Sequence, residues 1–239
     1  MRTKLLTFVC LLAVSSSNMA LADDSHKAAH GGEIFQMFKL EADGGANRDG
    51  AIYSWDLDGW VGTDENKLWL KVEGEKEHGK TTEQSEFWVM YSRNVATFWD
   101  AQAGIRFDEQ PDPTVYFVAG VNGLAPYFFE TEAHLFVSED GDITARLRQE
   151  KDFLITQRLI TQPYMEVHFS AQHVHELEIG SGITSGEFGI QTRYEITRKF
   201  APYIDLRYER KLGGTSAIAR KNGEKSDDVI ASIGLRLMF

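Results

Sequence analysis

DVIASIGLRLMF, residues 228–239, is the stretch of sequence that decides the fold. Apolar side chains occupy every second position from Val229 to Phe239, while Ser232 and Arg236 are among the residues between them. This period of two is the pattern of a β-strand with two different faces. A strand with lipid on one side and a polar lumen on the other requires such alternation. The alternative is the last strand of a soluble β-sandwich.

The same alternation recurs along the chain. In segment 201–210, Ile204 and Leu206 face one way, while Asp205 and Arg207 face the other. The candidate strands are 33–42, 51–61, 66–75, 84–93, 97–107, 114–121, 126–138, 141–153, 158–171, 185–196, 201–211 and 228–239. Their number is even, as single-chain bacterial barrels require, so the sequence predicts an all-β fold, a transmembrane antiparallel β-barrel of about 12 strands.

The connections between these segments differ in length. If both termini of the chain are periplasmic, the outward loops are 43–50, 76–83, 108–113, 139–140, 172–184 and 212–227. The turns at the other end are mostly shorter, which is the asymmetry of outer-membrane barrels. Segment 141–153 is the weak member, because Gln149 and Lys151 fall on its lipid-facing side. A β-bulge or a position at the aqueous rim would accommodate them.

The start of the chain predicts export. Arg2 and Lys4 precede an apolar run at 5–14, and Ala-Leu-Ala at 20–22 fits the pattern that signal peptidase needs. We therefore expect a signal peptide at 1–22 that is cleaved after Ala22, a short periplasmic tail at 23–32, and an outer-membrane β-barrel at 33–239. The expected location is the outer membrane of a Gram-negative cell, with its lipid as a partner.

Charge and cysteine content narrow the choice of partners. The formal net charge is −11, which argues against nucleic acid and allows attraction of metal cations. The single cysteine, Cys10, lies in the expected signal peptide. The mature chain would therefore have no disulfide and no thiolate metal site.

Several short motifs occur in a set order along the chain. They are 67–75 (KLWLKVEGE), 123–127 (GLAPY), 156–163 (TQRLITQP), 193–196 (RYEI), 200–203 (FAPY) and, in the last outer loop, Gly214-Thr215 followed by Ala219-Arg220. In this order, from about residue 33 to the end, the chain resembles the copper resistance protein B family of outer-membrane proteins. Some members carry a long region rich in Met and His ahead of the barrel. In this chain the corresponding region is the short stretch 23–32, whose only residues of these two types are His26 and His30.

The resemblance implies a role in copper tolerance, by binding copper, limiting its entry or assisting its exit across the outer membrane. It implies a copper ion as the ligand, no organic cofactor and no enzymatic activity. A copper-binding protein or oxidase in the periplasm is the partner that the family context suggests. Because the region that corresponds to the Met- and His-rich segment is so short, the resemblance to the family applies to the barrel.

His173 and His175 are the first candidates for metal ligands. They lie in an expected outer loop, close to Glu176 and Glu178. A His-x-His pair on a loop can hold Cu(II) or Zn(II), because imidazole is a good ligand for both. A solvated loop without metal explains the same residues, and the sequence favours it.

A second set of candidates faces the predicted lumen. Glu130, Glu132 and His134 project inward from one strand, and Glu166 and His168 project inward from the strand two places along. Arginines on the strand between them would pair with these carboxylates through forked hydrogen bonds and would repel a cation. The residues expected in lumen ion pairs are Arg146, Arg148, Glu187, Arg193, Glu195, Asp205, Arg207 and Glu209. The sequence favours a salt-bridged lumen over a metal relay.

Met37 and Met90 are the other inward candidates, and Trp88 is the inward position next to Met90 on the same strand. Thioethers are credible ligands of Cu(I). Two isolated methionines in a barrel are more commonly packing residues. Both interpretations stay open for this pair.

Three classes of function remain. The first is a copper-tolerance barrel that binds or passes the ion. The second is a small outer-membrane porin with a salt-bridged lumen and no specific copper site, since a barrel of this size is either filled or open. The third is an enzyme, for which Ser170 and His168 share an inward face. A nucleophile and a base two residues apart on one strand would compete for space, which disfavours this class.

Overall fold

The computed structural model describes residues 33–77, 84–110, 113–175 and 177–239. Its strands are β1 (Phe35–Ala46), β2 (Ala51–Gly62), β3 (Asn66–Glu77), β4 (Gln84–Ala96), β5 (Trp99–Gln110), β6 (Thr114–Ala125), β7 (Phe129–Ser138), β8 (Ile143–Glu150), β9 (Phe153–Leu154), β10 (Leu159–Ser170), β11 (Gly182–Tyr194), β12 (Phe200–Lys211) and β13 (Asp227–Met238). A 3₁₀ turn, η1 (Pro126–Phe128), and one helix, α1 (Gly213–Asn222), complete it. Within the described ranges no helix has the length and apolar character needed to cross a bilayer. The expected signal peptide and tail lie outside these ranges.

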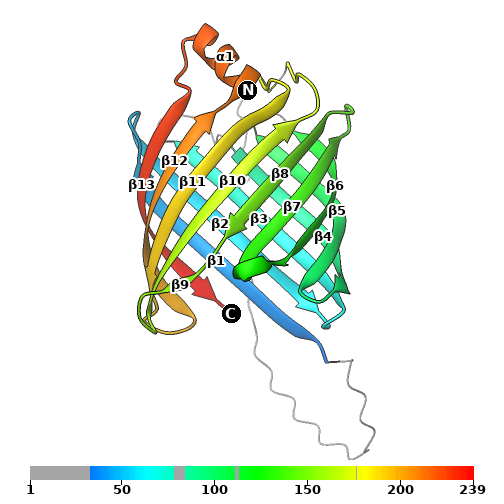
Figure 1. Ribbon diagram of the computed structural model, residues 1–239, viewed down its shortest axis with the longest axis vertical. Helices are drawn as coiled ribbons and strands as arrows, with labels where there is room; N and C mark the ends of the chain where they lie inside the picture. Colours follow the sequence, from blue (N-terminus) through cyan, green and yellow to red (C-terminus); the bar gives the residue numbers. More distant parts are fainter. Residues whose placement is uncertain (1–32, 78–83, 111–112, 176) are drawn as a thin grey trace, which may run out of the picture. The chain divides into compact units, whose positions relative to one another are not determined.

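Neighbouring strands pair antiparallel around a closed barrel (Figure 1). β1 pairs with β2 on one edge and with β13 on the other, where Leu40 lies opposite Leu237. β10 pairs with β8 and β9 on one edge and with β11 on the other, so β8 and β9 share one strand position. The barrel therefore has 12 strand positions, which confirms the fold expected from the sequence.

The alternation in the sequence separates the two faces of the barrel wall. On β13, Ile233 is 70% exposed on the outside, whereas Ser232 and Arg236 are buried inside. β12 repeats the arrangement, with Ile204 exposed and Asp205 buried. Because every second side chain points outward, the apolar side chains face lipid and the charged ones converge on the lumen.

The two ends of the barrel differ. One end, which we call the turn end, carries the connections 63–65, 97–98, 126–128, 155–158 and 195–199, together with the start of β1 and the end of β13. The other, the loop end, carries the ends of β3 and β5 and the connections 47–50, 139–142, 171–175, 177–181 and 212–226. The connection 212–226, predicted only as a loop, contains α1, at the top of Figure 1. Gly223, with φ +80°, ends this helix, because its N–H bonds back to Ala219 and Arg220.

The strand expected at 141–153 is interrupted. β8 stops at Glu150 and the chain resumes as β9 at Phe153. Lys151 lies in the break, with its ammonium 5.1 and 5.2 Å from the ring centroids of Phe129 and Phe153. Gln149 donates a hydrogen bond to Thr131 Oγ1 at 3.2 Å. A break near the turn end therefore accounts for the polar residues on this part of the outer wall.

Candidate functional site

An aromatic and apolar cluster fills one side of the lumen. Its members are Trp69, Trp88, Met90, Tyr116, Val118 and Phe136, from β3, β4, β6 and β7. Trp88 is 1% exposed, and its indole N–H donates to Glu86 Oε2 at 3.0 Å. Phe136 meets Trp88 edge to face, with ring centroids 5.0 Å apart. This side of the barrel is packed like the core of a soluble protein.

A cavity of about 1210 Å³ occupies the remaining lumen. Its lining comes from strands around the barrel and from loop-end residues such as Asn47, Glu178 and Glu224. Among the described residues that line it, Asp and Glu outnumber Lys and Arg two to one. A cleft lined by one sign of charge raises the local concentration of counter-ions. The lumen therefore suits cations rather than anions.

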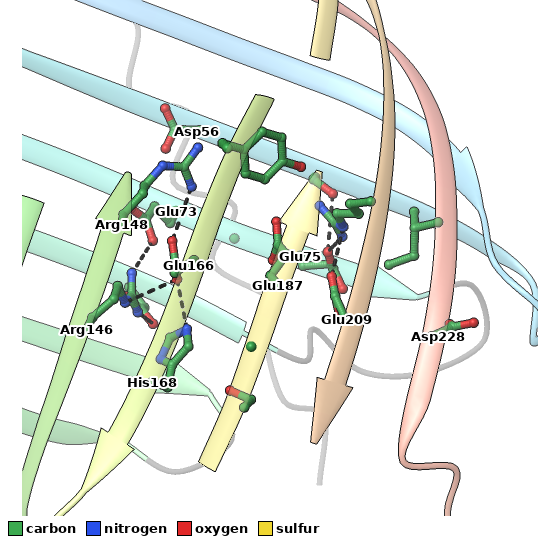
Figure 2. A pocket seen from close by; sticks show the side chains of 18 of the residues that line it. Asp56, Glu73, Glu75, Arg146, Arg148, Glu166, His168, Glu187, Glu209 and Asp228 are labelled. Carbon is green, nitrogen blue, oxygen red and sulfur yellow. Dashed lines mark hydrogen bonds and ion pairs between the residues drawn. The ribbon is translucent and has the colours of Figure 1, made fainter. Parts of the chain in front are cut away.

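Glu166 of β10 lies at the centre of a dense ion-pair network (Figure 2). Its Oε2 lies 3.2 Å from Arg148 Nη1, and its Oε1 lies 3.5 Å from Arg146 Nε. His168 Nε2 lies 2.8 Å from the same Oε1. Arg146 also donates to Glu73 Oε2 at 2.8 Å, which links β8 to β3 across the lumen. Glu166, His168 and both arginines are thus brought together, and the carboxylate already has three partners.

Glu132, on β7, is likewise paired. The buried ammonium of Lys71 lies 2.5 Å from Glu132 Oε2 and 3.1 Å from Asp58 Oδ2, so it connects β3 to β7 across the lumen. Glu130, two residues nearer the turn end, is exposed and has no ion-pair partner in the described part of the chain. The structure therefore separates Glu130 from the network around Glu166.

Arg207 of β12 holds a further cluster. Its guanidinium bonds Glu75 of β3, and its Nε lies 2.8 Å from Glu209 Oε1. Nearby, Asp205 Oδ2 accepts the hydroxyl of Tyr164 at 3.1 Å. The other oxygen, Asp205 Oδ1, is buried and has no hydrogen-bond partner within the described ranges. This part of the lumen keeps unsatisfied negative charge.

Some carboxylates that line the cavity have no cationic nitrogen within 4.0 Å, counting only described residues. They are Asp43, Asp56, Glu178, Glu187, Asp205 and Asp228. Asp56 Oδ1 is also buried without a hydrogen-bond partner. Figure 2 shows Asp56, Glu187 and Asp228 on three different strands. Apart from Glu178, which lies in the connection between β10 and β11, these carboxylates come from the consecutive strands β11, β12, β13, β1 and β2, so the unpaired negative charge lies on one side of the cavity.

Arg193 and Glu195 lie near the turn end. Arg193 Nη1 donates to Asp152 Oδ1 at 3.0 Å and to Gln162 Oε1 at 3.3 Å. Glu195 Oε1 lies 4.0 Å from Arg193 Nε, and its other oxygen lies 3.5 Å from Arg198. Arg193 and Glu195 do not line the main cavity, and Gln162 connects Arg193 to the residues that do.

His173 and His175 lie at the loop end, in the connection between β10 and β11. Their ring centroids are 4.3 Å apart, and the rings are tilted by 43°. Val174 between them is buried and pairs with Ile179. Glu178 accepts a hydrogen bond from Asn222 of α1 at 2.9 Å, and Glu176 lies outside the described residues. The two rings thus form a close pair that could offer two nitrogens to one cation.

The other candidates are packed or peripheral. His134 is 4% exposed, with Nε2 2.8 Å from Gln102 Oε1 and its ring against the edge of Trp88. Met90 is fully buried in the aromatic cluster. Met37 is 37% exposed near the turn end of β1. In the part of the chain that the structure describes, no group of three or more His, Cys, Asp or Glu could hold a metal ion.

Sequence reasoning missed many of the partners that cross the lumen. They are Glu41, Asp58, Lys71, Glu73, Glu75, Glu86, Arg106 and Arg236. Each occupies an inward position of its strand, so the period of two was the available signal. That signal does not show which strands face each other across the lumen. The partners of these side chains can therefore be identified only from the closed barrel.

The fold and the charged lumen define an outer-membrane β-barrel. The family model described as "Copper resistance protein B precursor (CopB)" matches residues 34–239. The chain therefore belongs to the copper resistance protein B family, which confirms the resemblance found in the sequence.

Two relatives support this assignment. The chain is 40% identical over 188 residues to Copper resistance protein B of Escherichia coli. It is 38% identical over 192 residues to Copper resistance protein B homolog of Pseudomonas syringae pv. tomato. These alignments cover 78% and 80% of this chain but only 63% and 65% of the relatives. The chain thus spans less than two thirds of the length of either relative.

Solved structures of porins share the fold. The NanC porin has a TM-score of 0.58 at 13% identity, with 83% of this chain and 98% of that chain covered. The KdgM porin has a TM-score of 0.52 at 8% identity, with 84% and 99% covered. At such low identity the likeness shows the architecture alone.

Proposed function

We propose that this barrel serves copper tolerance by taking copper cations into its acidic lumen and limiting their passage across the outer membrane. The observation that carries the proposal is the two-to-one excess of acidic over basic side chains around the cavity. Such a lining concentrates cations and repels anions. Family membership indicates which cation is relevant, because the relatives are named for copper resistance.

The loop end is the proposed entry. In barrels of this type the longer loops face outward and the short turns face the periplasm. His173 and His175 form a close pair at this end. Imidazole binds copper well, whereas hard cations such as Mg²⁺ prefer oxygen ligands and keep their water. The pair is therefore proposed to favour copper among the cations that the lumen attracts.

Calorimetric titration of the refolded full-length protein in detergent tests this proposal. We expect Cu(II) to bind more tightly than Mg²⁺, and the double variant His173→Ala, His175→Ala to lose that difference. The matched control is His168→Ala, a histidine whose partner is Glu166, which should keep the copper preference. Binding of copper no tighter than that of magnesium by the unmodified protein would overturn the proposal.

A general porin is the second candidate, because the cavity is large and the solved neighbours are porins. One KdgM porin structure is a complex with disordered oligogalacturonate, a chain of acidic sugars. The acidic lumen here would repel such a ligand, so a porin of this kind would favour cations. Equal permeation of K⁺ and copper, without tight copper binding, would favour this alternative.

A non-enzymatic role fits the neighbours and the local geometry. Relatives are named for resistance and the similar folds are porins. Ser170 Oγ donates to Gln172 O at 2.6 Å, while His168 Nε2 lies 2.8 Å from Glu166. The serine and the histidine therefore have separate partners. A periplasmic copper-binding protein or oxidase stays a prediction from the family.

A further inference from the structure

The cavity ends at a polar layer near the turn end. The residues of its lining that lie nearest this end include Lys39, Glu41, Gln162, Gln191 and Arg236. A second, small pocket of about 30 Å³ is lined by turn-end residues of β11 to β13 and the 195–199 turn. Arg236 lines both spaces. Its side chain is therefore part of the partition between the acidic lumen and the turn end.

Hydrogen bonds from several strands hold the guanidinium of Arg236 in place. Its Nε donates to Glu41 Oε1 at 2.6 Å. Its Nη2 donates to Gln191 Oε1 at 2.7 Å and to Gln162 Oε1 at 3.1 Å. Gln191 Nε2 in turn donates to the same oxygen of Glu41 at 3.2 Å. These bonds join β13, β1, β11 and β10, so the layer crosses part of the lumen.

The layer is tightly packed, and it holds two cations, Arg236 and Lys39, at the turn end of the acidic cavity. Arg236, Gln162 and Gln191 are each at least nine-tenths buried. Glu41 faces two cations, Arg236 and Lys39, the latter at 3.7 Å. Gln162 Nε2 also donates to Glu150 Oε1 at 2.9 Å, so carboxylates belong to the layer as well, and Arg236 is the cation of the layer that lines both spaces.

A positive group in a narrow, poorly hydrated passage is an effective barrier to cations. Coulomb repulsion at short distance is strong where the effective dielectric constant is low. Arginine side chains exclude cations from other pores for this reason. The guanidinium also fills space that an ion would need.

We propose that Arg236 is the gate residue of this barrel, which closes the turn end of the lumen to cations. The proposal deepens the proposed function, since it explains how an acidic lumen would hold copper and yet limit its passage. Cations enter from the loop end, collect among the unpaired carboxylates and stop at the Arg236 layer. Displacement or neutralisation of Arg236 opens the path.

Conductance of the full-length protein in planar bilayers, with KCl alone, tests the gate. We expect Arg236→Gln to raise K⁺ conductance about tenfold. The repulsion between K⁺ and a nearby unit positive charge at a low effective dielectric constant is larger than the free energy that corresponds to a tenfold change. Arg236→Lys, which keeps the charge, should stay close to the unmodified protein. The control Arg207→Gln removes a lumen arginine from the wide cavity and should change conductance less than about twofold.

A second variant tests the gate in case Arg236→Gln does not fold. Arg236→Ser combined with Glu41→Ser removes both members of the ion pair, so no new unpaired charge is buried between them. It should also raise conductance, and the mobility of unheated protein on gels shows whether each variant is folded. Unchanged conductance in folded Arg236→Gln and in the double variant would overturn the gate. An equal rise in Arg207→Gln would overturn it as well.

The KCl measurement separates the two proposals. If Arg236→Gln conducts and copper does not bind, the gate stands and the copper function fails. If copper binds as expected and conductance never rises, the function stands and the gate fails.

Discussion

Arg146 of β8 and Glu86 of β4 form an ion pair across the lumen, with Arg146 Nη2 2.9 Å from Glu86 Oε1. The side chain of Glu86 is fully buried. Arg106 Nη2 also lies 2.9 Å from Glu86 Oε1, and the indole of Trp88 donates to its Oε2. One carboxylate thus contacts two guanidinium groups beside the aromatic cluster, and it ties β4, β5 and β8 together.

Removal of Glu86 should destabilise the barrel strongly. Glu86→Ala leaves two buried guanidinium groups with fewer partners, and breaking a buried ion pair costs about 3 kcal/mol or more. Urea unfolding in lipid vesicles measures the loss. The control Glu209→Ala removes a carboxylate that is 38% exposed, for which a loss of about 0–1 kcal/mol is expected. Equal losses in the two variants would contradict a special role for Glu86.

Met90 should behave as a packing residue rather than as a copper ligand. It is fully buried among aromatic rings and does not line the cavity. Met90→Ala should lower the free energy of unfolding by about 2–5 kcal/mol, because it creates a cavity. Met90→Leu should cost less than about 1.5 kcal/mol. Calorimetry should show unchanged copper affinity in Met90→Leu, and a loss of affinity there would restore Met90 as a ligand.

The period of two in the sequence is sufficient for most of the fold. It places Ile233 outside and Arg236 inside, and it gives strand ranges close to those observed, because lipid and lumen impose opposite demands on alternate residues. It could not predict α1, whose weak signal is the Gly223 that ends it. It also could not predict the break after Glu150, because the contacts of Gln149 and Lys151 are with residues of another strand.

Gly189 of β11 should not tolerate a side chain. A Cβ there would come within 2.3 Å of the ring of Tyr164, whose hydroxyl is fixed by Asp205. Gly189→Ala should therefore cost about 1–3 kcal/mol through overpacking. The matched control on the same strand is Gly186→Ala, where the nearest atom would lie 3.6 Å away. Thermal unfolding should show little change in the control, and equal shifts would contradict the packing argument.

Ile233 should sit in the hydrocarbon layer. It lies in the middle of β13 and is 70% exposed on the outer wall, whereas Val229 lies near the loop end of the same face. Arginine at the bilayer midplane of such barrels costs about 2–4 kcal/mol, and near the interface about 0–1 kcal/mol. Ile233→Arg should therefore destabilise the barrel in vesicles more than Val229→Arg. Similar costs at both positions would argue against this depth in the membrane.

The candidate site was harder to predict than the fold. Glu166 and His168 could be placed together from one strand, but the sequence could not show that Arg146 reaches Glu73 on the opposite wall. Those contacts depend on how the barrel closes, which brings residues far apart in sequence together. The Arg236 layer was missed for the same reason, since its bonds join β13 to β1, β10 and β11.

The lumen should select cations, and this selectivity should depend on the unpaired carboxylates. In a KCl gradient, channels of the Arg236→Gln variant should show a reversal potential of the sign expected for K⁺. The preference should weaken from 0.1 M to 1 M salt, because the screening length falls from about 10 Å to about 3 Å. Asp56→Asn combined with Glu187→Gln removes two charges that have no ion-pair partner within the described ranges, and should lower the preference further. Asp140→Asn, in an exposed loop-end turn, is the control and should have no effect. An anion-selective channel would show that the lining charges do not govern the lumen, and the proposed copper function would then lose the observation that carries it.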